Sequence, residues 1–220
     1  MEELNCETAF TIPVLGGIPV GESVVVTWII MAVLVVLSIL LTRNLKVENP
    51  GKGQLMLETA VTSLHNMVGG MVGEKGQRYV PYLMTVLLYI GMANIIGLFG
   101  FKPPTKDFTV TLALAGMSIV LIEAAGILAK GVKGWIKSFA EPVAIMTPFN
   151  ILELVIKPLS LCMRLFGNVL GAFVIMELIK QLLPVGLPVP FSLYFDIFDG
   201  LIQAYVFVFL TSLFIKEAIE

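Results

Sequence analysis

Charged residues are scarce in this chain. Asp, Glu, Lys and Arg make up 14% of its 220 residues, whereas a soluble domain of this size carries about 25%. Hydrophobic residues make up 57%, and the mean hydropathy is +0.94. Several uncharged apolar runs are long enough to cross about 30 Å of hydrocarbon. These figures exclude an ordinary soluble domain and predict a polytopic membrane protein.

Cysteine is also rare, and its placement argues against a disulfide or a metal site. Cys6 lies near the amino end, and Cys162 lies inside an apolar run. No Cys-x-x-Cys pair or Cys/His spacing suggests a metal, and we expect no cofactor. The single histidine, His65, is expected to lie on a helix surface.

Signatures of nucleotide and nucleic-acid binding are missing as well. No GxxxxGK loop is present, so ATP chemistry cannot reside in this chain. No basic stripe exists, which disfavours nucleic acid as a partner. The first residues, MEELNCETAF, are acidic and contain no Lys or Arg, so no cleavable signal peptide is expected.

Five apolar spans predict an all-α membrane protein. The prolines in the turn LLPVGLPVP cannot continue a helix, so the last two spans are expected to form a hairpin. The predicted spans are 24–42, 79–101, 109–129, 148–182 and 190–215. We expect one integral membrane domain, 1–220, made of an outer N-terminal segment 1–23, the first span 24–42, an interfacial helix 51–76, spans two and three within 79–129, and the hairpin 142–220.

The interfacial helix is predicted from apolar residues at helical spacing. It either lies along the cytoplasmic interface or packs on the bundle. Its apolar stripe consists of Leu57, Ala60, Val61, Leu64, Met67, Val68 and Met71.

The distribution of Lys and Arg predicts the orientation. Positive charges cluster between spans one and two, after span three and after span five, whereas the opposite loops carry few. The positive-inside rule therefore places the N-terminus outside and the C-terminus in the cytoplasm. Five crossings satisfy that arrangement.

The fourth span is too long for an upright helix. Residues 149–181 would extend about 50 Å at ~1.5 Å per residue, against a hydrocarbon core of ~30 Å. The helix must lean strongly, kink or project beyond the bilayer. Pro158 supplies one site for a kink.

Arg164 sits in the middle of the longest apolar stretch, which runs from Phe149 to Lys180. A cation on a membrane helix costs about 2.5–3.5 kcal/mol on insertion scales, so it normally faces protein or a watery cavity. Arginine stays protonated at any ordinary pH. A charge that never titrates can attract or block mobile ions, but it cannot relay a proton.

Other polar residues fall on matching helix faces. Asn168 follows Arg164 by four residues and Glu153 precedes it by eleven, so the three lie close to one face. If the last two spans pack antiparallel, one seam carries arginine, amides and carboxylates. The stripe on the last span, at i, i+3 and i+7, consists of Asp196, Asp199 and Gln203.

Simpler roles fit the same residues. Arg164 can be neutralised inside the bundle by Asp196, Asp199 or Glu177 as a structural ion pair, and spacing alone does not decide against it. Glu177 can instead cap the outer end of its helix. Glu123, in the third span, either snorkels to the cytoplasmic interface or lines a water-filled entrance.

Nearly the whole chain resembles subunit a of the F-type ATP synthases. The most specific stretch is KPLSLCMRLFGN, from Lys157 to Asn168. The supporting stretches, in the family's order and spacing, are NIIGLFGFKPPTKDFTVTLALA (Asn94–Ala115), KGVKGWIKSFAEP (Lys130–Pro142) and LIQAYVFVFL (Leu201–Leu210).

The resemblance implies the stator half of a rotary ion motor in the bacterial cell membrane. Two aqueous half-channels would carry H⁺ or Na⁺ to and from carboxylates of the c-ring, which the inclined hairpin would face. Arg164 matches the family's essential arginine between the half-channels, and Asn168 and Gln203 match its polar partners. The implied partners are the c-ring, the peripheral-stalk subunit b and membrane lipid, with ATP chemistry on other chains.

Two departures from the family pattern shift the expected roles. Many bacterial members carry a carboxylate nine residues after the arginine, where this chain has Phe173. Seven residues before the glutamine others carry histidine or glutamate, and this chain has Asp196. Proton relay in the outer half-channel would then rest on Asp196, assisted by Asp199 or Glu177.

Two other functions use the same charged residues. The first is a self-contained secondary transporter with the seam as its substrate site. Such folds often show an inverted repeat, whereas no convincing repeat is present here and five spans divide poorly into halves. The second is a membrane anchor whose buried charges act only as glue.

Overall fold

The chain forms a bundle of long apolar helices. The computed structural model describes residues 8–12, 18–43, 45–46, 51–99, 102–139, 147–182 and 188–220. Within these residues the predicted all-α membrane fold with five spans is confirmed. The helices long and apolar enough to cross a membrane are Glu22–Thr42, Glu74–Leu98, Phe108–Ser138, Thr147–Ile179 and Pro190–Ile219.

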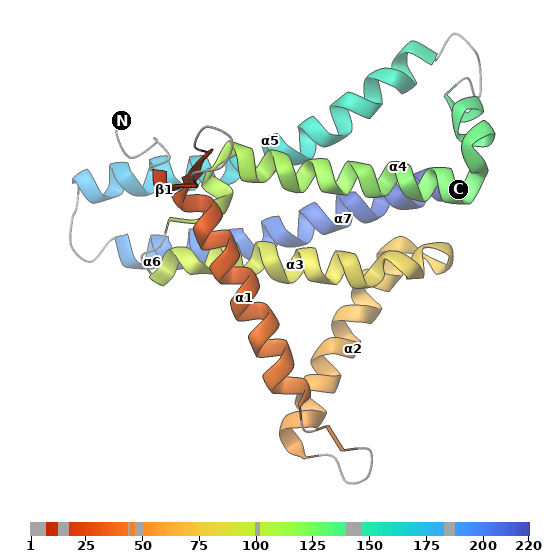
Figure 1. The fold of residues 1–220 in the computed structure, drawn as a ribbon. Helices are drawn as coiled ribbons and strands as arrows, with labels where there is room; N and C mark the ends of the chain where they lie inside the picture. Colours follow the sequence, from red (N-terminus) through yellow and green to blue (C-terminus); the bar gives the residue numbers. More distant parts are fainter. Residues whose placement is uncertain are drawn as a thin grey trace.

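Short non-α segments interrupt the helices (Figure 1). Two strands come first, 3₁₀ segments lie at both ends of the second span and after it, and a π-helical segment, η6, precedes the last helix. In chain order the elements are β1 (Thr8–Ile12), β2 (Ile18–Gly21), α1 (Glu22–Thr42), α2 (Lys52–Val72), η2 (Glu74–Tyr79), α3 (Val80–Ile95), η3 (Ile96–Phe99), η4 (Pro104–Lys106), α4 (Phe108–Ser138), α5 (Thr147–Leu182), α6 (Pro188–Ser192), η6 (Leu193–Asp199) and α7 (Gly200–Ile219).

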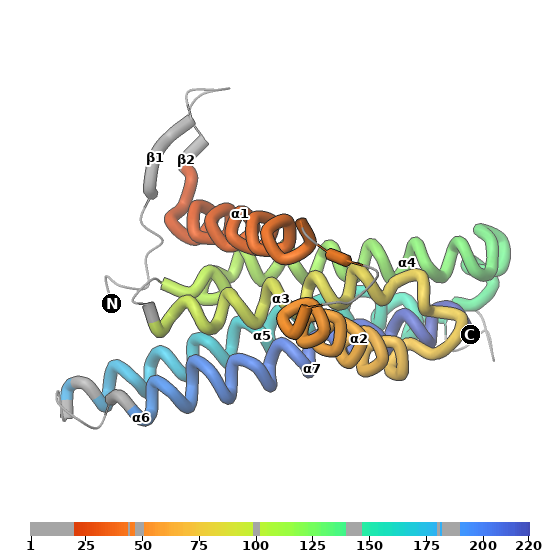
Figure 2. The backbone as a smooth tube through the Cα atoms, turned by 90° about the horizontal axis from the view of Figure 1, so that it is seen from below, coloured from red at the N-terminus to blue at the C-terminus, as the bar shows by residue number. Residues whose placement is uncertain are grey.

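Helices α3, α4 and α7 form the centre of the fold. Helix α7 packs against both α3 and α4, and Figures 1 and 2 show the three side by side. Ala115, Ser118, Ala125 and Ala204 are fully buried in these helices. Small side chains let membrane helices approach closely, so dispersion contacts replace the hydrophobic driving force that lipid cannot supply.

Helix α5 packs along α4 and changes direction part-way along its length (Figure 1). Pro158 lies inside this helix. A proline removes one backbone hydrogen bond and clashes with the preceding turn, which is the usual cause of such a bend. Beyond the proline, Leu161, Cys162 and Leu165 are buried and hold α5 against the bundle.

Helices α1 and α2 run outward from the centre and converge at their far ends, so that they form the two arms of a V (Figure 1). Helix α1 buries only Val26 and Ile30. Helix α2 covers most of the predicted interfacial helix, and its last turns bury Val68 and Val72 against α3 and α7. Its first turns leave apolar side chains exposed, with Met56 at 78%.

A short β-hairpin, which is not predicted from the sequence, precedes α1. Strand β1 pairs antiparallel with β2, with Phe10 opposite Val20 and Ile12 opposite Ile18. It lies in the segment expected on the outer side. The turn between the strands lies outside the described residues.

Candidate functional site

Arg164 is exposed on α5, in the middle of a membrane-spanning helix. It forms no hydrogen bond or ion pair with any residue that the structure describes. The structural ion pair with Asp196, Asp199 or Glu177 is therefore not formed within the described chain. A charge at this depth requires compensation, and this chain's described residues do not provide it.

Two glycines leave the helix surface beside Arg164 without side chains. Gly167 and Gly171 follow it by three and seven residues, so all three share one helix face. A Cβ placed on either glycine would meet no atom within 4 Å. This face of α5 is open to a neighbouring surface, which can approach the backbone closely around the guanidinium.

The amides of α5 and α7 meet as the sequence analysis predicts. Asn168 Nδ2 donates to Gln203 Oε1 across the helix pair, at a long 3.4 Å. Gln203 is 6% exposed, and its Nε2 has no hydrogen-bond partner among the described residues. A buried polar atom of this kind calls for a specific explanation. Here it leaves an unused hydrogen-bond donor next to the contact between α5 and α7.

The carboxylates of the last span sit on a π-helical segment. At the end of η6 the amide of Gly200 donates to the carbonyls of Ile197 and Phe195, and Phe195 lies five residues earlier. π-Helical segments are rare in proteins overall, but those that do occur are often found at functional sites. Because the 3.6-residue period does not hold here, the predicted stripe of Asp196, Asp199 and Gln203 is not a simple α-helical one.

Asp196 forms no ion pair with Arg164 and lies beside η3 instead. Ser192 Oγ donates to its Oδ2 at 2.8 Å, and a Cβ on Gly97 would lie 3.3 Å from its Oδ1. Asp199 and Glu177 are partly exposed and form no hydrogen bond or ion pair with another described residue. The structure thus brings together the two amides, while the three carboxylates remain separate from the arginine.

Buried hydrogen bonds of Asn94 hold the start of α7 against α3. Asn94 Nδ2 donates to the carbonyl of Gly200 at 2.9 Å, and Thr105 Oγ1 donates to Asn94 Oδ1 at 3.0 Å. A Cβ on Gly200 would lie only 2.7 Å from the Cβ of Asn94. Asn94 acts between helices, as expected for polar residues in membrane bundles, and it fixes the point where η6 becomes α7.

The other two candidate carboxylates have partners inside the chain. Glu153 Oε2 lies 3.3 Å from Lys157 Nζ, which also lies 3.2 Å from Glu217 Oε2 on α7. Glu123 Oε2 accepts a hydrogen bond from the indole of Trp135 at 2.8 Å. Sequence reasoning missed Lys157, Glu217 and Trp135. The i, i+4 spacing of Glu153 and Lys157 was an available signal for the first pair.

Phe173 has a cationic neighbour. Lys106 Nζ lies 3.2 Å from the centroid of the Phe173 ring. A cation over an aromatic face contributes about 0.5–2 kcal/mol, depending on desolvation. This contact fastens η4 to α5 at the position where the family resemblance leads one to expect a carboxylate.

The sequence model of the ATP synthase A chain family matches residues 24–216. The chain belongs to this family. All eight candidate residues fall within the matched range, and the resemblance drawn from the sequence is confirmed. Members are membrane-sector subunits of the ATP synthase, so the chain is a multi-pass, ion-translocating stator subunit without catalytic chemistry of its own.

Relatives of this ATP synthase family align along almost the full length. ATP synthase subunit a of Moorella thermoacetica is 36% identical over 207 residues, covering 94% of each chain. ATP synthase subunit a 1 of Hahella chejuensis is 35% identical over 207 residues, covering 94% of this chain and 87% of the relative. The sodium-ion-specific subunit a of Propionigenium modestum is 32% identical over 219 residues, covering 92% and 75%.

Proposed function

We propose that this chain carries H⁺ or Na⁺ through two aqueous half-channels to and from the carboxylates of a c-ring, with Arg164 separating the half-channels. One observation carries the proposal: Arg164 stands on an open, glycine-flanked face of α5 without a counter-charge among the described residues. A passing ring carboxylate supplies that counter-charge. Ion flow, ring rotation and ATP synthesis or hydrolysis on other subunits are thereby coupled.

The strength of the attraction suits a moving partner. At ~5 Å and an effective dielectric constant near 20, a guanidinium and a carboxylate attract by about 3 kcal/mol. This favours release of the bound ion as a loaded carboxylate arrives, without trapping the ring. Because the guanidinium keeps its proton, protons cannot hop past it from one half-channel to the other.

The polar residues around α7 take supporting roles in this proposal. Asn168 and Gln203 position the groups around Arg164, and the unused Nε2 donor of Gln203 is available to the ion path. Asp196, with Asp199 or Glu177 assisting, relays ions in the outer half-channel. Glu153 and Glu123 belong to the cytoplasmic side, and their contacts with Lys157 and Trp135 support a positioning role for them.

The wider setting follows from the same proposal. The subunit lies in a bacterial cell membrane with its N-terminus outside and its C-terminus in the cytoplasm. The inclined pair α5 and α7 faces the c-ring, and the peripheral-stalk subunit b and membrane lipid contact the remaining surfaces. The relative from Propionigenium modestum is sodium-specific by name, so the coupling ion needs its own test.

A disulfide cross-link tests whether the Arg164 face meets the ring. We expect Gly167→Cys, in an enzyme lacking Cys6 and Cys162, to form a disulfide with a cysteine placed beside the ring carboxylate. Gly116→Cys on α4 is the matched control, because a Cβ there also meets no atom within 4 Å. Equal cross-linking of the two variants, or none at Gly167→Cys, contradicts the proposed face.

The coupling ion is identified by comparing ATP synthesis with and without sodium in the reconstituted enzyme plus an ionophore. Synthesis that requires Na⁺ and survives a protonophore indicates sodium coupling. Synthesis that is indifferent to Na⁺ and abolished by the protonophore indicates proton coupling.

A further inference from the structure

The carboxyl-terminal part of α4 turns aside from the bundle. Gly131 has φ 74° and ψ 160°, outside the helical region, and helical turns resume after it. Glycine adopts positive φ without the steric cost that other residues meet. Figures 1 and 2 both show the chain beyond this point running across the direction of α4. The predicted span 109–129 stops short of Gly131, and the turn is not predicted from the sequence.

Trp135 holds this turned segment in a fixed position. Its indole Nε1 donates to Glu123 Oε2 at 2.8 Å, and a Cβ on Gly126 would lie 3.4 Å from its Cδ1. Its ring packs edge-on against Phe139, with 4.8 Å between centroids. Asn150 Nδ2 donates to the carbonyl of Phe139 at 2.9 Å. The segment is tied to α4 at one point and to α5 at another.

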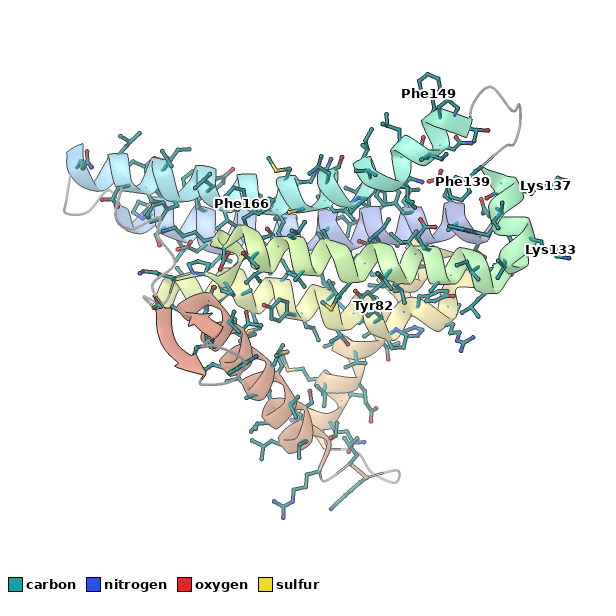
Figure 3. The ribbon with its side chains drawn as sticks, turned by 45° about the horizontal axis from the view of Figure 1, so that its top comes forward. Tyr82, Lys133, Lys137, Phe139, Phe149 and Phe166 are labelled. Carbon is teal, nitrogen blue, oxygen red and sulfur yellow. The ribbon has the colours of Figure 1, made fainter. Side chains whose placement is uncertain are left out.

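The segment exposes cations and apolar side chains together. Lys130, Lys133 and Lys137 are exposed, and Figure 3 shows Lys133 and Lys137 at one end of the molecule, pointing away from it. Lys130 and Lys133 form no ion pair with any described residue. Val132 and Ile136, one helical turn apart, are each 60% exposed.

We propose that this segment, Lys130–Phe139, binds the phosphate groups of anionic phospholipids at the membrane surface; below it is called the basic segment. Three features of the segment match that ligand. Its lysines complement the phosphate charge, each worth about 1 kcal/mol, or about fivefold in affinity, near an anionic surface. Trp135 belongs to the residue type that concentrates at the headgroup level. Because α4 is a membrane-spanning helix, a segment that runs across its direction lies along the membrane surface.

The exposed apolar residues select lipid over an acidic protein partner. Val132 and Ile136 lie within the same short segment as the lysines, an arrangement by which interfacial helices bury aliphatic side chains at the acyl boundary while lysines reach the headgroups. A purely electrostatic protein contact has no use for these aliphatic groups. The Glu123–Trp135 bond then serves to hold the binding segment at the correct depth.

Tryptophan quenching by brominated lipids tests the proposal in the reconstituted enzyme. In a Trp28→Phe background, with tryptophans of the other subunits also replaced, emission reports on Trp135. We expect brominated phosphatidylglycerol to quench this emission more strongly than brominated phosphatidylcholine when each is titrated into phosphatidylcholine bilayers. Lys133→Gln should weaken the apparent affinity for phosphatidylglycerol about fivefold, and Lys133→Arg should retain it.

Lys75→Gln is the matched control, because Lys75 is also exposed but lies in η2, outside the basic segment. It should leave the lipid preference unchanged, and ATP-driven ion pumping should be unchanged in both glutamine variants. Equal quenching by the two lipids in the parent enzyme overturns the proposal. An equal loss for Lys75→Gln and Lys133→Gln also overturns it, since it shows a general surface charge instead of a site. If an acidic peptide from another subunit abolishes the parent enzyme's preference for phosphatidylglycerol, the basic segment binds a protein instead of lipid.

Discussion

Arg164→Ala is expected to abolish coupled ATP synthesis and to open a passive ion leak. The substitution removes an attraction of about 3 kcal/mol between the guanidinium and a ring carboxylate, which corresponds to a factor of roughly 100 in ion release. It also removes the charge that keeps ions from crossing directly between half-channels. Each proton that short-circuits wastes about 2.3 kcal/mol per 100 mV. Reconstituted liposomes allow both quantities to be measured, as synthesis under an imposed gradient and as ion flux without nucleotide.

Two companion variants locate the effect in the guanidinium. Arg164→Lys should also impair coupling, because a desolvated lysine can lose its proton whereas arginine keeps its own. Met163→Ala should leave synthesis close to the parental rate, since Met163 is an exposed neighbour (50%) without charge. Parental synthesis by Arg164→Ala, in an enzyme shown to be fully assembled, contradicts the proposed mechanism.

Gly200→Ala is expected to destabilise the subunit strongly for so small a change. The new methyl would lie 2.7 Å from the Asn94 Cβ, and Asn94 cannot retreat without losing its bonds to Gly200 and Thr105. Overpacking a well-packed core costs about 1–3 kcal/mol. In chains of about 150–250 residues, each kcal/mol lowers Tm by about 2–4 °C. We expect a fall of several degrees in thermal unfolding of the purified chain in detergent, followed by circular dichroism.

Gly171→Ala provides the control for this experiment. Gly171 is also a helical glycine in a membrane span, but its Cβ position is open. Replacing it should change Tm little. If the two substitutions lower Tm equally, the close contact between Gly200 and Asn94 does not account for the loss of stability in Gly200→Ala.

The spans could be predicted from the sequence because lipid makes hydropathy decisive. An apolar run long enough to cross the bilayer must become a helix, since no water is present to satisfy its backbone. The predicted 24–42 and 148–182 accordingly lie within a few residues of α1 and α5. The β-hairpin and the turn at Gly131 were not predicted, because each depends on local backbone geometry that composition does not encode.

The candidate site could be predicted only in part, for a related reason. Spacing along regular helices brought Asn168 and Gln203 together, and the structure places them in contact. The same arithmetic could not place Asp196, because η6 departs from the α-helical period. It also could not decide whether Arg164 pairs within the chain, since that depends on which carboxylates face it across the helix pair.

The η6 segment also affects how this chain should be compared with its relatives. Its hydrogen bonds span one residue more than those of an α-helix. A relative lacking that extra residue would have its upstream acid rotated by about 100° around the helix axis relative to the downstream glutamine. Residues that align in sequence upstream of η6 can therefore project from different sides of the helix in two relatives. Whether Asp196 is equivalent to an acidic residue or a histidine of a relative must be judged from superposed backbones.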